Sequence, residues 1–240
     1  MKFSLILNSR GRVPQFVNFI NSVFETTRDV NNIEILVRID KDDSSMLDFY
    51  ERQLKPHPYQ NMLFLVGERP KNLHVSLNYL AKHSVGQYIF VLNDDVLLDR
   101  KDWDTHAFSK LESSKGKDGI IYGRTHDNSV DKPPGSEYAS FPIISRAGYE
   151  TLGFVMHNDF VGLGGDNSIF KVYNSVGKVV DLPDVKIDHV FHNSLSKVFQ
   201  PDATAYHMRT NTGKNYVDPE TLDISKDVEK LRKRIQECPV

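Results

Sequence analysis

Short apolar runs alternate along the chain with segments in which apolar residues recur every three or four positions. Runs rich in β-branched and aromatic residues predict buried strands, and the three-to-four-residue spacing predicts amphipathic helices. In the first hundred residues the predicted strands are 3–7, 33–39, 62–66 and 88–92, and the helices between them are 13–24, 46–54 and 72–83. Alternation of strand and helix at this spacing is typical of βαβ units and predicts a mostly parallel sheet.

The second half of the chain is less regular. The predicted helices there are 104–111, 147–152, 168–176 and 219–238, and the predicted strands are 119–123, 178–182 and 185–190. Residues 124–140 are polar, contain Pro133-Pro134-Gly135 and are interpreted as a long loop. Unstructured loops of that length are usually functional.

These elements predict one α/β domain, residues 1–194, with helices on both sides of the sheet, followed by a C-terminal extension, residues 195–240. The last helix of the extension is heavily charged but has an apolar stripe formed by Val228, Leu231 and Ile235. Packing of this helix across the domain explains the stripe, and a homodimer contact is the alternative.

Composition narrows the class of protein. The formal net charge of −2 over 240 residues lacks the basic excess of a nucleic-acid-binding protein, although a local anion site stays open. No apolar run is long enough to span a bilayer, and the apolar stretch in residues 1–7 is too short for a signal peptide. The single cysteine, Cys238, suits a reducing compartment. We therefore expect a cytoplasmic protein with no transmembrane segment and no nucleic-acid partner.

The strand predicted at 88–92 runs directly into Asn93-Asp94-Asp95. Ligands of parallel sheets bind outside the carboxyl ends of the strands. Three other charged residues follow strand ends and are expected at the same rim: Arg10, Asp40 and Arg69. Adjacent strand residues point to opposite faces, so Asn93 and Asp95 are expected to share one face and Asp94 to point to the other. Amide and carboxylate oxygens suit Mg²⁺ or Mn²⁺, whereas the alternative is an ordinary strand-to-turn junction.

Four stretches, taken in order, resemble a known family. They are Leu5-Ile-Leu-Asn-Ser-Arg10; Val37-Arg-Ile-Asp40 with the following Asp42-Asp43-Ser44; the segment 77–96, which contains Asn93-Asp94-Asp95; and Gly164-Gly165-Asp166-Asn167 with Asp188-His189. Their order and spacing resemble the GT-A fold of nucleotide-sugar-dependent glycosyltransferases, especially the family-2-like group. The resemblance covers residues 3–192 and implies a Rossmann-like, three-layer α/β/α domain with a C-terminal helical extension.

The resemblance also implies a binding site for a nucleoside-diphosphate sugar and a divalent cation. The implied nucleotide contacts come from Asn8, Ser9, Arg10, Asp40, Asn93, Asp94 and Asp95. Asp40 would accept a hydrogen bond from a ring N–H of the base, which favours UDP, with dTDP or GDP next. Asp95 would hold Mn²⁺ or Mg²⁺ with His189 as the second ligand, and His192 is the alternative to His189. The sequence departs from the family pattern at Asn93, where one carboxylate is missing from the metal motif.

Asp166 follows two glycines and lies just before the predicted helix. The resemblance implies that it is the general base that deprotonates the acceptor hydroxyl, with inversion at the anomeric carbon. The alternative is a helix N-cap, whose carboxylate only satisfies backbone donors.

Arg12, like Arg10, could pair with phosphates or pack on the base, and the alternative for Arg12 is a surface arginine. Arg69 and Lys71 are interpreted as solvated, with a phosphate contact as the alternative, and Asn78 is interpreted as structural. Trp103 is interpreted as a core or rim anchor, and the alternative is stacking on a sugar ring.

Together these inferences predict a metal-dependent hexosyltransferase of glycan biosynthesis that moves a sugar from a UDP-sugar to the hydroxyl of a glycan or another acceptor. One alternative is a sugar nucleotidyltransferase, but residues 8–12 are poor in glycine for its phosphate loop. The other is a non-catalytic glycan-binding or scaffold module on the same fold, for which Asn93 is the only indication.

Overall fold

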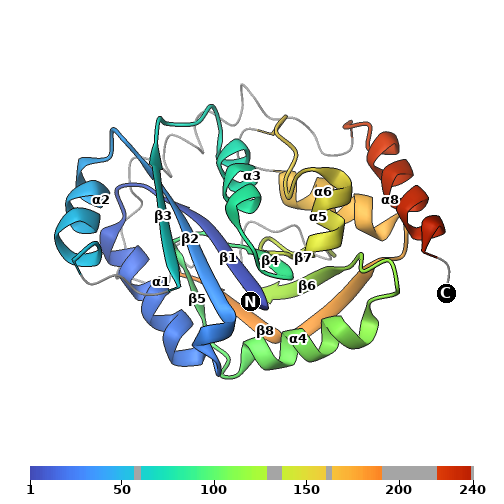
Figure 1. Ribbon diagram of the computed structural model, residues 1–240, viewed down its shortest axis with the longest axis horizontal. Coiled ribbons are helices and arrows are strands. Elements are labelled where there is room, and N and C mark those ends of the chain that lie inside the picture. Colours follow the sequence, from blue (N-terminus) through green and yellow to red (C-terminus); the bar gives the residue numbers. More distant parts are fainter. Residues whose placement is uncertain (57–60, 129–136, 161–163, 191–220, 239–240) are drawn as a thin grey trace.

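The computed structural model describes residues 1–56, 61–128, 137–160, 164–190 and 221–238. Eight strands of these described segments form one sheet with the order β3-β2-β1-β4-β7-β6-β8-β5 (Figure 1). They are β1 (Phe3–Ser9), β2 (Ile33–Asp40), β3 (Met62–Gly67), β4 (Tyr88–Val91), β5 (Val96–Leu98), β6 (Tyr122–Asp127), β7 (Ile143–Ser145) and β8 (Val179–His189). Strands β1 to β4 are mutually parallel, β7 is antiparallel to β4 and β6, and β8 is parallel to β6. The prediction of a mostly parallel sheet is confirmed.

Helices cover both faces of the sheet (Figure 1). One face is covered by α1 (Val13–Thr26), α2 (Ser44–Phe49) and α4 (Trp103–Ser114). The other is covered by α3 (Leu73–His83), α5 (Arg146–Leu152), α6 (Gly165–Asn174) and α8 (Ser225–Glu237). A short 3₁₀ turn, η1 (Val30–Asn32), precedes β2, and a π-helical turn, η2 (Tyr50–Leu54), extends α2. The predicted three-layer α/β/α architecture is therefore confirmed.

The hydrophobic core consists of two clusters, one on each face of the sheet. Strand β1 serves both, because Leu5 and Leu7 point to the first cluster and Ile6 to the second. Trp103 is fully buried in the first cluster, and its Nε1 donates to Thr27 Oγ1 over 3.0 Å. It is a core anchor, as one of the two interpretations of this tryptophan predicted.

The far edge of the sheet folds back toward α1. Strand β5 pairs with the end of β8 and packs against α1, where the Leu98 backbone N–H donates to Ser22 Oγ over 3.2 Å. The sequence did not predict β5, because the apolar residues after Asp95 looked like a continuation of the preceding strand. They instead begin a new strand that runs antiparallel to β8.

Two further boundaries differ from the prediction. Strand β6 continues to Asp127, into the segment predicted as a loop, because it pairs with β8. The two strands predicted at 178–182 and 185–190 are one strand, β8. The pairing of β8 with β6 shifts register between Thr125 and His126, and the shift lies opposite a segment of β8 that contains Pro183. Proline lacks a backbone N–H for the ladder, and a β-bulge is a position where a strand accommodates it.

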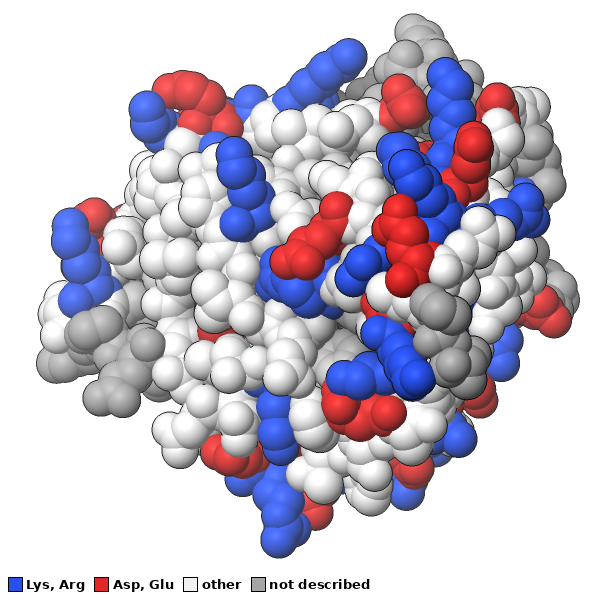
Figure 2. Space-filling model, turned by 45° about the vertical axis from the view of Figure 1, so that its right-hand side comes forward, with Lys and Arg blue, Asp and Glu red and all other residues white. Residues whose placement is uncertain are grey.

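The charged C-terminal helix α8 packs on α5 and α6 through the predicted apolar stripe. Val228 is 6% exposed and Leu231 is fully buried. On the face of the molecule in Figure 2, Lys and Arg are interspersed with Asp and Glu, and the described residues form no uniformly basic area there. No helix in the described part of the chain is both long and apolar enough to cross a membrane.

We expect Leu231→Ala to lower the free energy of unfolding by about 2–5 kcal/mol, because it removes a fully buried side chain and leaves a cavity under α8. The neighbouring exposed substitution Arg232→Ala should change it by less than about 0.5 kcal/mol. Urea denaturation followed by circular dichroism measures both. Equal stabilities of the two variants would contradict the packing of α8.

Candidate functional site

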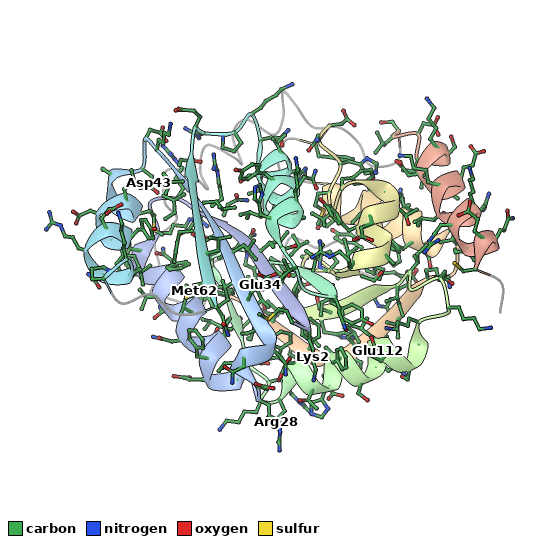
Figure 3. The ribbon with its side chains drawn as sticks, viewed as in Figure 1. Lys2, Arg28, Glu34, Asp43, Met62 and Glu112 are labelled. Atoms are coloured by element: carbon green, nitrogen blue, oxygen red, sulfur yellow. The ribbon has the colours of Figure 1, made fainter. Side chains whose placement is uncertain are left out.

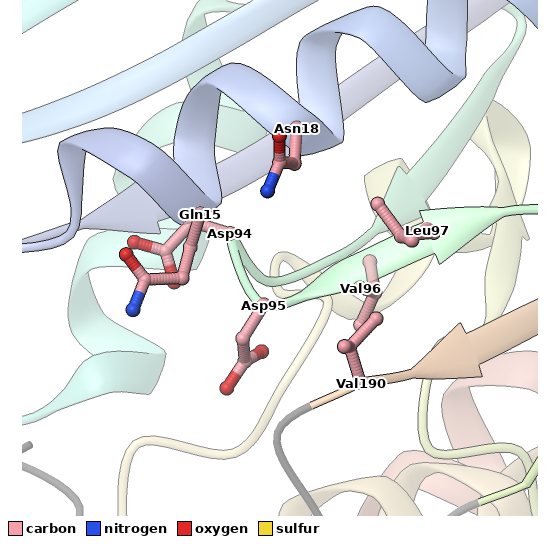
Figure 4. Close-up of a pocket in the computed structure, with 7 residues that line it drawn as sticks. All are labelled: Gln15, Asn18, Asp94, Asp95, Val96, Leu97 and Val190. Atoms are coloured by element: carbon pink, nitrogen blue, oxygen red, sulfur yellow. The ribbon is translucent and has the colours of Figure 1, made fainter. Parts of the chain in front are cut away.

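The parallel strands β1, β2 and β4 end at one rim of the sheet. Figure 3 places Asp43, just after β2, at this rim, whereas Lys2, Glu34 and Met62 mark the opposite ends of β1, β2 and β3. Strand β4 ends at Val91, and the chain turns through residues 92–95 into β5. The turn lies beside the first turns of α1, and the carboxylate of Asp95 projects away from β5 (Figure 4).

The turn brings two buried carboxylates onto one arginine. Arg12 Nη1 donates to Asp94 Oδ1 over 3.1 Å and to Asp95 Oδ2 over 3.0 Å. Ser9 Oγ, at the end of β1, donates to Asp94 Oδ2 over 2.7 Å. The expectation that Asp94 and Asp95 point to opposite faces is wrong, because β4 ends before the motif and strand alternation no longer applies. The alternative interpretation of Arg12, a surface arginine, is also wrong, since its side chain is only 13% exposed.

Burial controls the protonation of Asp94. Burial is the main cause that raises the pKa of its carboxyl well above the ordinary value; Arg12 lowers that pKa, the nearby charge of Asp95 raises it, and the hydrogen bond from Ser9 lowers it. Two carboxylates share one guanidinium, so the arrangement retains net negative charge when both are ionised. A site of this kind favours an additional cation.

The late histidine lies next to the motif because β8 pairs with β5. His189 is opposite Val96 in that ladder, and its Nε2 lies 3.4 Å from Asp95 Oδ1. Its ring packs edge-on against Phe141 with 5.2 Å between centroids, and its backbone N–H donates to Asn128 Oδ1 over 2.8 Å. The ring is thereby fixed in orientation. The alternative ligand, His192, lies outside the described residues.

Asp95 and His189 fit a divalent cation. Neighbouring ligands on an octahedral ion at about 2.1 Å lie about 3 Å apart, close to the 3.4 Å between Asp95 Oδ1 and His189 Nε2. A carboxylate and an imidazole suit Mn²⁺. Among the described residues no three His, Cys, Asp or Glu side chains converge on one point.

A second cluster joins the loops that follow β1 and β2. Arg10 Nη1 donates to Asp40 Oδ2 over 3.0 Å, and Arg10 also makes two hydrogen bonds to the Asp42 carboxylate. The hydrogen bond from Arg10 lowers the pKa of Asp42. Gly11 N donates to Asp43 Oδ2 over 2.7 Å. The structure thus places Arg10 and Asp40 in direct contact, and Asp40 is 8% exposed.

Asn8 and Ser9 face the protein interior. Asn8 Oδ1 accepts a hydrogen bond from Ser76 Oγ of α3, and Ser9 holds Asp94. Asn8 Nδ2 is buried and has no hydrogen-bond partner among the described residues. A buried donor in this state is uncommon and marks the end of β1 as a place where a partner is missing. The side chain of Asn93 is half-buried in the turn.

Asp166 lies in the first turn of α6, on the other half of the sheet. Helix α6 begins at Gly165 rather than at the predicted residue 168, and Gly164, with φ 98°, is its N-cap. The interpretation of Asp166 as N-cap is therefore wrong. Its Oδ1 accepts a hydrogen bond from the Asn167 N–H over 2.9 Å, and the helix N-terminus favours its negative charge.

The position of Asp166 depends on a close approach between α6 and α3. A Cβ on Gly165 would lie 2.6 Å from His74 Cε1, so any larger residue would force the His74 ring or the helix to move. His74 is 4% exposed, and its Nδ1 lies 3.0 Å from the backbone oxygen of His157. Sequence reasoning missed His74; its only signal was the pair of glycines before Asp166, which indicated a close approach by another group.

Asn78, further along α3, forms hydrogen bonds with the backbone of Val155 and Met156, in agreement with its interpretation as structural.

A small cavity beside the motif is lined by Gln15 and Asn18 of α1 together with Asp94, Asp95 and Val190 (Figure 4). Its volume of about 20 Å³ has room for about one water molecule. It is far too small for a sugar nucleotide.

Residues 4–173 match the profile of the family described as Glycosyl transferase family 2. No curated protein matches the chain. Solved structures of similar fold include TarS 1–349 of S. aureus in complex with UDP, with a TM-score of 0.59 and 13% identity, and this match covers 78% of the chain and 60% of TarS 1–349.

Two other similar structures match with a TM-score of 0.62 and 12% identity. One is TarS 1–349 of S. aureus in complex with UDP-GlcNAc, where 100% of the chain and 82% of TarS 1–349 are covered. The other is the mannosyltransferase PcManGT from Pyrobaculum calidifontis in complex with GDP-Man and Mn²⁺, where 98% of the chain and 74% of PcManGT are covered. At these identities the structures establish the shared fold.

We expect Gly165→Ala to lower the free energy of unfolding by about 1–3 kcal/mol, because the new methyl group would overlap the His74 ring. The same substitution in a His74→Ala background should be less costly by about 1 kcal/mol or more. This double-mutant cycle, measured by urea denaturation, cancels the change in helix propensity that both backgrounds share. If the effects of the two substitutions on the free energy of unfolding were additive, the His74 ring and the position of Gly165 would not be in steric contact.

Proposed function

The chain belongs to glycosyl transferase family 2, and from that premise we propose that it transfers a hexose from a nucleoside-diphosphate sugar to an acceptor hydroxyl. The GT-A fold predicted from the motif order is confirmed by the family match and by the similar structures. The observation that supports the proposal most directly is the position of Asp94, Asp95 and His189 together at the carboxyl ends of parallel strands.

We assign the donor side of the reaction to the rim of β1, β2 and β4. Asp95 and His189 would hold Mn²⁺ or Mg²⁺, which when bound offsets the negative charge that builds on the leaving diphosphate. Asp40 would accept from a ring N–H of the base, and Arg10 fixes the Asp40 carboxylate for that contact. Uracil offers its ring N3–H for this contact, so we favour UDP; the similar TarS structures hold UDP and UDP-GlcNAc, whereas PcManGT holds GDP-Man.

We assign the acceptor side to α6. Asp166 would take the proton from the acceptor hydroxyl while the oxygen forms its bond to the anomeric carbon and the bond from that carbon to the diphosphate oxygen breaks. Attack from the face opposite the leaving group inverts the anomeric configuration. The partial exposure of Asp166 leaves it accessible to a hydroxyl, and the His74–Gly165 contact fixes the helix that presents it.

Two alternative functions make different predictions. A sugar nucleotidyltransferase would turn over UTP and a sugar phosphate. A non-catalytic module, suggested by Asn93 in place of a carboxylate, would bind no nucleotide in a metal-dependent way. Mn²⁺-dependent binding of UDP by the wild-type protein discriminates between the glycosyltransferase and the non-catalytic module.

We expect Mn²⁺ to tighten UDP binding to the wild-type protein by about tenfold or more, a difference of about 1.4 kcal/mol. Asp95→Asn should abolish this gain, because it removes the carboxylate that faces His189. Asp99→Asn, at an exposed aspartate just beyond β5, is the matched control and should behave like wild type. Isothermal titration calorimetry with and without Mn²⁺ measures the effect. An absence of Mn²⁺-dependent UDP binding in wild type would favour the non-catalytic module.

We expect Asp166→Asn to lower kcat by about 10²–10⁴-fold and leave the donor KM within about twofold, since a general base acts in the transition state. Hydrolysis of UDP-sugars measures this without a known acceptor, because water then takes the place of the hydroxyl. The exposed Asp159→Asn is the control. An unchanged kcat would remove Asp166 from the mechanism, and NMR of the first-formed anomer tests inversion separately.

A further inference from the structure

Arg12 lies where a cation is expected. One of its guanidinium nitrogens contacts both Asp94 and Asp95, at 3.1 and 3.0 Å. The side chains of the two aspartates are 4% and 7% exposed, so Arg12 is their main charge compensation in the described part of the chain. Buried carboxylates need such compensation, because an uncompensated charge in the interior is strongly unfavourable.

A metal ion at Asp95 would share that carboxylate with Arg12. The ion would contact Oδ1, which faces His189, while Arg12 holds Oδ2. Two cations bound to opposite oxygens of one carboxylate repel each other at short range, and screening is weak at buried positions. Arg12 therefore opposes the binding of a divalent ion to the nucleotide-free protein.

A bound diphosphate changes this balance. Guanidinium groups bind phosphate oxygens in a bidentate manner, and the diphosphate brings enough negative charge to compensate both Arg12 and the ion. Arg12 follows β1 at the same rim as the two aspartates, which is the rim assigned to the donor diphosphate.

We propose that Arg12 competes with the divalent cation for Asp94 and Asp95 and so makes metal binding dependent on the nucleotide diphosphate. This inference rests on the proposed function, because it uses the metal and donor site described there. Arg12 has two roles in it: it neutralises the buried carboxylates while the site is without ligand, and it contacts the diphosphate once the donor is bound. Binding of either ligand then promotes binding of the other.

Arg10 provides a matched control. It follows the same strand and also binds two aspartates, but these are Asp40 and Asp42 on the loop after β2. A general change in charge near the rim would therefore affect Arg10→Gln and Arg12→Gln alike, whereas competition at the metal motif involves Arg12 alone.

The test is binding of Mn²⁺ alone, measured by the electron paramagnetic resonance signal of free Mn²⁺ in the absence of nucleotide. Arg12→Gln should bind Mn²⁺ about tenfold or more tightly than wild type, and Arg10→Gln should bind it as wild type does. Arg12→Lys, which keeps the charge, should remain close to wild type. Equal or weaker Mn²⁺ binding by Arg12→Gln would overturn the inference and leave Arg12 as a residue that only holds the two carboxylates in place. An absence of Mn²⁺ binding to every variant would overturn it as well.

A second measurement uses the wild-type protein and does not depend on the folding of Arg12→Gln. The side-chain ¹⁵Nε signal of Arg12, identified by its loss in Arg12→Lys, should shift when UDP and Mg²⁺ are added together. An unchanged signal at saturating UDP and Mg²⁺ would overturn the inference. If UDP fails to bind under any condition, the proposed function fails, and the comparison of Mn²⁺ binding between Arg12→Gln and wild type still tests the competition.

Discussion

The contact between Arg12 and the two aspartates is the constraint on which the rest of the site depends. The turn that joins β4 to β5 places Asp94 and Asp95 in a buried setting, where ionised carboxylates are unfavourable without positive charge or hydrogen-bond donors. Arg12 and Ser9 come from the segment that follows or ends β1, so the compensation is available only when β1 and β4 lie side by side. Correct pairing of the central strands and a neutralised motif are therefore one requirement.

The first hundred residues were predictable because their signals are local. Each strand is a continuous apolar run and each helix has a clear apolar face, and βαβ units lie next to one another in space in the order in which they occur in the chain. The position of Arg10, Asp40 and Asp95 after strand ends followed from that pattern alone. In the structure Arg10 and Asp40 are in direct contact, which adjacent parallel strands allow.

The remaining features were not predictable from local patterns. Strand β5 has only three residues, and its pairing with β8 joins Val96 to His189, which are far apart in the sequence. The bonding of Arg12 to the motif depends on side-chain direction in a loop, which periodicity does not specify. The resemblance to a family predicted a role for His189, but only the β5–β8 ladder explains why this histidine lies next to Asp95.

The two halves of the site are built by different means, and this has a consequence for specificity. The proposed donor half rests on ion pairs among loops at the ends of parallel strands, where a substitution leaves a buried charge without a partner. The position of Asp166 rests on the packing of α6 against α3, where His74 meets Gly165. Changes in packing shift a helix by small amounts without leaving unpaired charges. Under the proposed assignment, the acceptor side would therefore be free to vary while the proposed nucleotide and metal site is kept.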